Sequence, residues 1–104
     1  MVTMPIGVTE SGDGFTKFPD GTLIQWGRES ASAGERNITV NFKIRFVNSN
    51  VSVSACPVYV TDSRVFITHD SADYKIGVTF YITDNDHVLT QNRAFRWIVI
   101  GRWK

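Results

Sequence analysis

Cysteine is nearly absent from the sequence, and this excludes a disulfide framework. The chain of 104 residues contains Cys56 alone, so no internal disulfide can form and nothing requires an oxidising compartment. Cys56 lies in a strand-like run, where we expect a small, buried apolar side chain rather than a reactive thiol. The core must therefore come from apolar packing, for which 42% hydrophobic residues, including seven Phe and three Trp, are enough.

An excess of one charge and a long apolar run are also missing. The chain has 11 basic and 10 acidic residues and a net charge of +1. Nucleic-acid and anionic-membrane surfaces need a basic patch, so we expect neither partner. No apolar run approaches the roughly 20 residues of a membrane-spanning helix, and residues 1–12 lack the features of a signal peptide. The composition predicts one soluble domain or the end piece of a longer protein, without membrane insertion.

Helical periodicity is missing too, and short alternating runs take its place. Ile38, Val40, Phe42 and Ile44 alternate with polar residues, which predicts a half-buried strand. A second stripe runs through Ile76, Val78, Phe80 and Ile82, with Tyr81 on the opposite face. Further strand candidates are residues 15–18, 22–27, 51–55, 58–60, 64–68 and 94–103. Six or seven short strands predict an all-β fold, either a small antiparallel β-sandwich or a small barrel.

Turn-forming residues separate these strands. Pro19-Asp20-Gly21 predicts a tight turn that joins residues 15–18 and 22–27 in a hairpin. Pro57 predicts an edge strand or a bulge. Residues 1–14 show no periodicity and are expected to form a linker. Polar loops are expected at residues 28–36, 46–50, 61–63, 69–74 and 83–92.

The last strand candidate is apolar on both of its faces. With a period of two, Phe95, Trp97, Val99 and Trp103 share one face, whereas Ile98 and Ile100 lie on the other. A strand needs apolar residues on both faces only when both are covered. We therefore expect one face to meet the core and the other to meet another copy of the chain. The interface candidates are Ile98, Ile100 and Trp103.

Side chains that suggest metal binding or catalysis lack the spacing that either function needs. His69, Asp70 and Asp73 form one group, and Asp84, Asp86 and His87 form another, but neither has ligand spacing such as Cys-x-x-Cys. The acidic residues Glu35, Asp62, Asp84 and Asp86 carry no motif of a glycosidase acid or nucleophile. Trp26, Trp97, Phe42, Phe80 and Trp103 lie at strand spacing typical of a core or subunit interface. We expect no metal, no cofactor, no catalytic residues and no enzymatic activity.

Two segments of the sequence resemble a known family. Residues 17–27 (KFPDGTLIQWG) and 95–101 (FRWIVIG) are similar to the start and end of the C-terminal domain of bacteriophage tail fibres. The resemblance covers about residues 14–103. One departure lies in residues 42–48 (FKIRFVN), where the family often has Phe-Pro-x-x-Phe-x-Asn and this chain has Lys43 in place of Pro.

The resemblance implies a homotrimeric β-sandwich at the tip of a virion tail fibre, assembled in the host cytoplasm. Residues 1–14 would be a linker or the end of the fibre shaft, and residues 15–104 the tip domain. The implied partner is a bacterial surface receptor, either lipopolysaccharide or another glycan, or an outer-membrane protein. Two alternatives remain open, namely a structural trimerisation cap and a stand-alone lectin-like module.

Receptor contacts are expected in loops held by the rigid sandwich. Alternating strand direction sorts the loops into two ends, and the end with residues 28–36, 61–63 and 83–92 has the longer and more polar loops. Their charged and amide side chains suit hydrogen bonding to sugar hydroxyls and phosphates. Tyr81 is added because it faces away from the apolar stripe. The candidates are Arg28, Glu29, Asp62, Arg64, Tyr81, Asp84, Asn85, Asp86, His87, Asn92 and Arg93.

Overall fold

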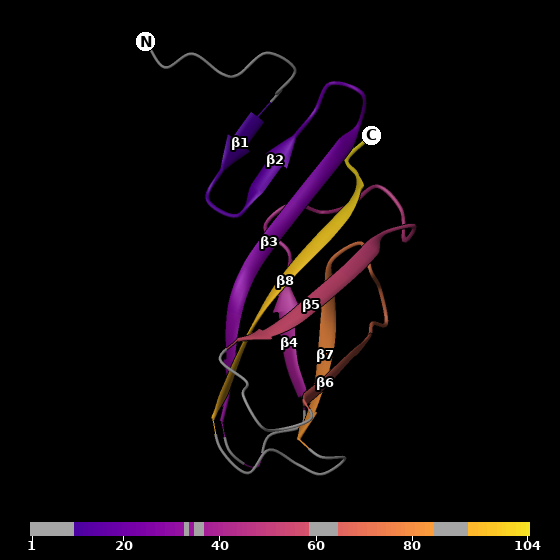
Figure 1. Ribbon diagram of the computed structural model, residues 1–104. Helices are drawn as coiled ribbons and strands as arrows, with labels where there is room; N and C mark the ends of the chain where they lie inside the picture. The colour runs from indigo at the N-terminus through magenta and orange to yellow at the C-terminus, as the bar shows by residue number, and fades with distance from the viewer. Residues whose placement is uncertain (1–9, 33, 35–36, 59–64, 85–91) are drawn as a thin grey trace.

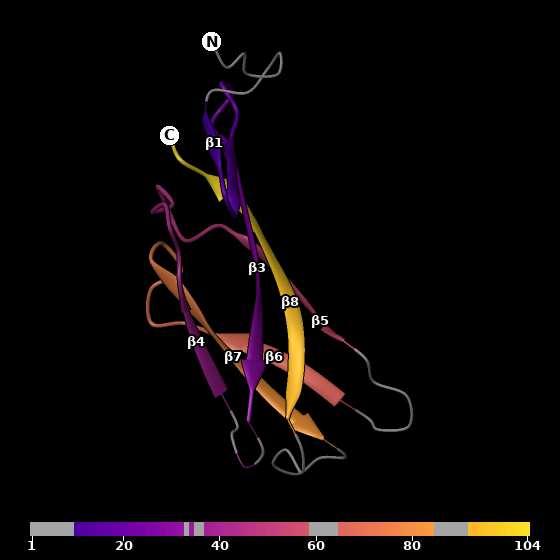
Figure 2. The same cartoon turned by 90° about the vertical axis from the view of Figure 1, so that its left-hand side faces the viewer.

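A computed structural model describes residues 10–32, 34, 37–58, 65–84 and 92–104, which form eight antiparallel strands in two sheets (Figures 1 and 2). The strands are β1 (Glu10–Gly12), β2 (Phe15–Lys17), β3 (Thr22–Ala31), β4 (Asn37–Asn41), β5 (Ser52–Val58), β6 (Val65–Asp70), β7 (Gly77–Asp84) and β8 (Arg93–Arg102). The first sheet has the order β1-β2-β3-β8-β5 and the second β4-β7-β6. This confirms the predicted all-β sandwich. In the described part of the chain, no helix is long and apolar enough to cross a membrane.

The longest strands, β3 and β8, lie side by side at the centre of the larger sheet. They pair in register along all ten residues, from Thr22 opposite Arg102 to Ala31 opposite Arg93. The two family-like segments are therefore direct partners, with Ile24 opposite Ile100 and Gly27 opposite Trp97. β5 pairs with the other side of β8, so Pro57 lies in an edge strand as predicted.

The core fills the space between the two sheets. The larger sheet contributes Phe95, Trp97 and Val99, all of them less than 9% exposed, as the alternation of the last strand predicts. The smaller sheet contributes Val78, Phe80 and Ile82, which are essentially inaccessible. The Phe80 ring centroid lies 5.2 Å from that of Phe95 and 6.4 Å from that of Trp97. These aromatic contacts join the sheets face to face.

A buried amide ties β3 to the chain segment that crosses between the sheets. Gln25 is 1% exposed, and its Nε2 donates to the Ile44 carbonyl at 2.8 Å. The Ile44 backbone N–H donates in return to Gln25 Oε1 at 3.1 Å. Both backbone groups of Ile44 are thus satisfied by one side chain. This fixes the segment so that Phe42 and Phe46 pack edge to face, with centroids 5.1 Å apart.

Two glycines in the paired segments make room for aromatic rings. A Cβ at Gly27 would lie 2.8 Å from the Trp97 indole, and a Cβ at Gly101 would lie 2.7 Å from the Phe46 ring. Any side chain at these positions would push a ring out of the core. The glycines at the ends of the two family-like segments therefore serve close packing.

The predicted hairpin turn is present at residues 18–22. The Thr22 N–H donates to Asp20 Oδ1 at 2.8 Å, and Gly21 has a φ of 101°, a conformation that favours glycine. The hydrogen bond from Thr22 is the main cause that lowers the pKa of Asp20 below its usual value, and the nearby Arg102 adds to it. The turn is therefore stabilised most when Asp20 is ionised.

Two strand boundaries differ from prediction because distant contacts set them. Arg28–Ala31 were expected in a loop but extend β3, since β8 offers a pairing partner up to Arg93. Residues 37–45 were expected as one strand, but β4 ends at Asn41. The Phe42 N–H then bonds the Ile76 carbonyl at 2.9 Å, and Gln25 holds Ile44. Pairing with β8 and the hydrogen bonds to Gln25 and Ile76 thus outweigh the local strand propensity of these residues.

Other single positions also differ. His69 and Asp70, expected in a loop, end β6, and Ile76, expected in the buried stripe, precedes β7 and is 52% exposed. Cys56 is exposed because its strand directs Val53 and Ala55 inward. In the expected linker, Glu10–Gly12 form β1, while residues 1–9 lie outside the described part. The domain boundary near residue 14 stays a prediction.

Replacing Gln25 with Met should strongly destabilise the fold. The change keeps the side-chain length but leaves the buried N–H and C=O of Ile44 without partners, a loss of about 2–4 kcal/mol in the free energy of unfolding. Denaturant titration measures it. Ser54→Ala, on the exposed side of β5, is the control and should change stability by less than about 0.5 kcal/mol. A Gln25→Met variant as stable as this control would contradict the bridging role.

The Asp20 turn should make stability depend on pH. A pKa lowered in the folded state means that Asp20 contributes stability above its ordinary pKa of 3.8, and that this contribution is lost as the pH falls through the folded-state pKa. The gap in thermal midpoint between the wild type and Asp20→Asn should therefore be larger at pH 7 and narrow at acid pH below about 4. A gap that stays constant over this range would contradict the account.

Candidate functional site

The strand ends that lead into the predicted receptor loops gather at one end of the sandwich, at the bottom of Figure 1. β3 ends at Ala31 opposite Arg93, where β8 begins. Val58, the last residue of β5, pairs with Ala94. In the smaller sheet, Val65 pairs with Asp84, which ends β7. The described ends of these strands therefore agree with the predicted sorting of the loops.

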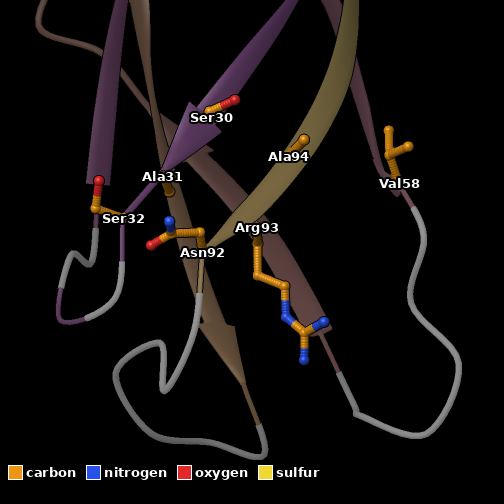
Figure 3. A pocket seen from close by; sticks show the side chains of 7 residues that line it. All are labelled: Ser30, Ala31, Ser32, Val58, Asn92, Arg93 and Ala94. Carbon is orange, nitrogen blue, oxygen red and sulfur yellow. The ribbon is translucent and has the colours of Figure 1, made fainter.

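A pocket of about 390 Å³ lies at this end (Figure 3). Asn92 and Arg93 at the start of β8 line it together with Ser32, just after β3. The remaining lining residues are the small or apolar Ser30, Ala31, Val58 and Ala94. A lining that combines polar and apolar side chains is typical of a binding pocket. The structure thus brings together two of the predicted contact residues, Asn92 and Arg93.

The other predicted contact residues do not join this pocket. Arg28 and Glu29 lie on β3 and line a different pocket of about 320 Å³, between β3 and β4. Tyr81, which faces away from the core as predicted, is 40% exposed on the smaller sheet, and Asp84 ends β7. The remaining candidates, Asp62, Arg64, Asn85, Asp86 and His87, lie outside the described residues.

The outer face of the larger sheet carries an apolar patch that the sequence predicted in part. Trp26, Ile98 and Ile100 are 42%, 39% and 43% exposed. Ile24, which pairs with Ile100, is half-buried beside them, and Trp26 pairs with Ile98. We call these four residues the outer apolar patch. Exposed apolar side chains that adjoin one another in this way are candidates for an interaction surface.

Trp103 lies apart from this patch. Its indole Nε1 donates to the Phe18 carbonyl at 2.8 Å. The ammonium groups of Lys17 and Lys104 lie 5.2 Å and 5.0 Å from the centroid of its ring. Trp103 is half-buried and packs against the core of its own chain. Of the three interface candidates, only Ile98 and Ile100 share one exposed surface.

Sequence reasoning missed the exposed Phe66. This residue is 53% exposed on β6 and pairs with Thr83, while the neighbouring Thr68 pairs with Tyr81. The alternation of β6 was the available signal, because Ile67 faces the core and its neighbours must face away.

The described residues hold no cluster of three or more His, Cys, Asp or Glu side chains that would suit a metal ion. Of the side chains considered as ligands, His69 contacts the Tyr74 hydroxyl through Nδ1 at 3.0 Å, and Asp73 lies 3.9 Å from Lys75. Asp86 and His87 are outside the described part. The visible geometry offers binding surfaces built from hydrogen-bonding and apolar side chains.

Solved structures of pyocin tail fibres share this fold. An N-truncated R1-type pyocin tail fibre superposes with a TM-score of 0.63 at 19% identity, over 94% of this chain and 86% of that one. An N-truncated R2-type fibre gives 0.66 at 14% identity, over 97% and 39%. A P. aeruginosa R1 pyocin fibre comprising C-terminal residues 323–701 gives 0.62 at 19% identity, over 94% and 28%. The chain thus spans well under half of the two longer fibres.

Sequence comparison assigns the family. No curated protein matches the chain. A family model described as "Putative tail fiber protein gp53-like, C-terminal" matches residues 17–102, which includes all of β3 and β8. These are the strands that carry the paired segments 17–27 and 95–101. The chain belongs to this family of gp53-like C-terminal domains of tail fibre proteins.

Proposed function

We propose that this tail-fibre domain forms a homotrimer and binds a surface molecule of the bacterial host, either a surface glycan such as lipopolysaccharide or an outer-membrane protein. The observation that carries the proposal is the outer apolar patch on a domain of this family. In a single chain, Trp26, Ile98 and Ile100 leave apolar surface exposed to water. Copies of the chain arranged around an axis would bury this surface and so stabilise the assembly.

The receptor-binding part of the proposal concerns the end of the sandwich where β8 begins. Asn92 and Arg93 line a pocket there, and the predicted contact residues 84–87 precede them in the chain. A trimer presents three copies of this end on one fibre. Weak single sites then add up to strong attachment, because each further contact forms at a high effective concentration. Particle attachment, with no chemical step, is the role we assign.

Placing a charge in the outer apolar patch should break the trimer. In the wild type, the thermal midpoint should rise with protein concentration, because dilution favours dissociation. Ile98→Lys should remove this dependence, since three lysines would be buried without partners. Phe66→Lys, an equally drastic change on the other sheet, should preserve it. A wild-type midpoint that does not vary with concentration would contradict the proposed trimer.

Alanine substitution of residues 84–87 should weaken attachment to host cells. The purified domain should compete with intact particles for the cells, and the variant should need a concentration at least about 10-fold higher. Alanine at Ser49 and Asn50 is the control, because these residues precede β5 where Ser52 pairs with Ile100, near the end of β8 rather than its start. If the 84–87 variant competes as well as this control, these residues do not bind the receptor. If no form of the domain competes, the structural-cap alternative is favoured.

A further inference from the structure

The pocket between β3 and β4 is lined by charged and amide side chains together with two tryptophans. It measures about 320 Å³ and lies along the edge of β3 that β2 leaves open, since β2 pairs only up to Gln25. The residues used here are Gly27, Arg28, Glu29, Asn41, Lys43 and Trp97. They come from β3, β4, the segment after β4, and β8. This volume suits a small ligand or one unit of a larger one.

Trp97, which lines this pocket, has a buried indole N–H. Trp97 is 8% exposed, and its indole Nε1 has no hydrogen-bond partner among the described residues. Gly27 covers the indole so closely that a Cβ there would be 2.8 Å from Nε1. The indole thus lies beneath Gly27, and its N–H signal can report a ligand bound in the pocket that Trp97 lines.

The pocket also holds a cation without a counter-ion. Arg28 is exposed and lies directly opposite Arg96 on β8, and like charges in this arrangement repel. Neither arginine forms an ion pair within the described residues. Asn41 is likewise exposed, and its side-chain amide forms no hydrogen bond there. Both side chains are available to a ligand.

The opposite rim is held in place by a contact within the chain. Lys43 Nζ donates to the Asp13 carbonyl and lies 3.9 Å from the Asp13 carboxylate. This contact joins the β1–β2 turn to the segment after β4. The pocket lining holds two cations, Arg28 and Lys43, and two carboxylates, Asp13 and Glu29, so its net charge is zero even though Arg28 forms no ion pair among the described residues.

We infer that this pocket binds a neutral sugar unit. Its balanced charge disfavours a phosphate or a carboxylate ligand, whereas hydroxyl groups can both donate to carboxylates and accept from Arg28 and Asn41. The inference deepens the proposed receptor binding and rests on it for the source of the sugar, a bacterial surface glycan.

Nuclear magnetic resonance of the ¹⁵N-labelled chain tests this directly. The probes are the methyl glycosides of glucose, galactose and N-acetylglucosamine. Titration should shift the indole N–H signal of Trp97 in a saturable way, with a dissociation constant on the order of 1 mM. The indole N–H of Trp103 should not move, because it is already bonded to the Phe18 carbonyl. If none of the three glycosides shifts the Trp97 signal at about 100 times that concentration, the inference is wrong.

A double variant separates binding in the pocket from effects elsewhere. Arg28→Ala with Asn41→Ala should weaken glycoside binding at least about 10-fold. Arg45→Ala with Asn50→Ala removes the same side-chain types from exposed positions outside the pocket and should leave it unchanged. Backbone signals report whether each variant is folded. A Trp97 shift that survives in the pocket variant would also overturn the inference.

Attachment to host cells distinguishes failure of this inference from failure of the proposed function. If the wild type and the pocket variant attach equally well, the receptor-binding function stands and the pocket is not the sugar site. If the wild type does not attach but the glycosides shift the Trp97 signal, the pocket binds sugar and the proposed receptor function is wrong. A competition experiment with purified lipopolysaccharide and purified capsule then identifies which glycan supplies the sugar.

Discussion

The full-length pairing of β3 with β8 is the constraint on which the rest of the structure depends. These two ten-residue strands form the centre of the larger sheet, and their register decides which side chains enter the core. It directs Gln25, Phe95 and Trp97 inward and leaves Trp26 and Ile98 outside. A slip by one residue would reverse every one of these positions. The core, the outer apolar patch and the pocket between β3 and β4 all follow from this register.

The two sheets are joined by contacts that start from these same strands. Gln25 captures both backbone groups of Ile44 and so sets the path of the chain between the sheets. Phe46 then lies over Gly101, and Trp97 lies over Gly27. The departure at Lys43 fits this arrangement, because the lysine lies at the surface and contacts Asp13 while both family phenylalanines pack inside.

The sequence correctly predicted those features that depend on neighbouring residues alone. The Asp20 turn, the two faces of β8 and the edge position of Pro57 follow from neighbouring residues and are present. The ends of β3 and β4 do not follow from neighbouring residues. β3 continues to Ala31 because it pairs with β8, and β4 stops at Asn41 because Gln25, far away in the sequence, binds the backbone of Ile44. The same limit applies to the site. The sequence predicted that Asn92 and Arg93 would be contact residues, and both line the pocket where β8 begins. The pocket between β3 and β4 could not be predicted, because it exists only where strands far apart in the sequence meet.

In the proposed assembly, the outer face of the larger sheet meets other copies of the chain, and the end of the sandwich where β8 begins meets the host. The central claim is that the outer apolar patch is covered by other copies, since the orientation of every binding surface depends on it. Light scattering of the purified wild-type chain tests this claim most directly. The account predicts a particle of three times the 11.7 kDa of one chain. A stable particle with the mass of a single chain would contradict it.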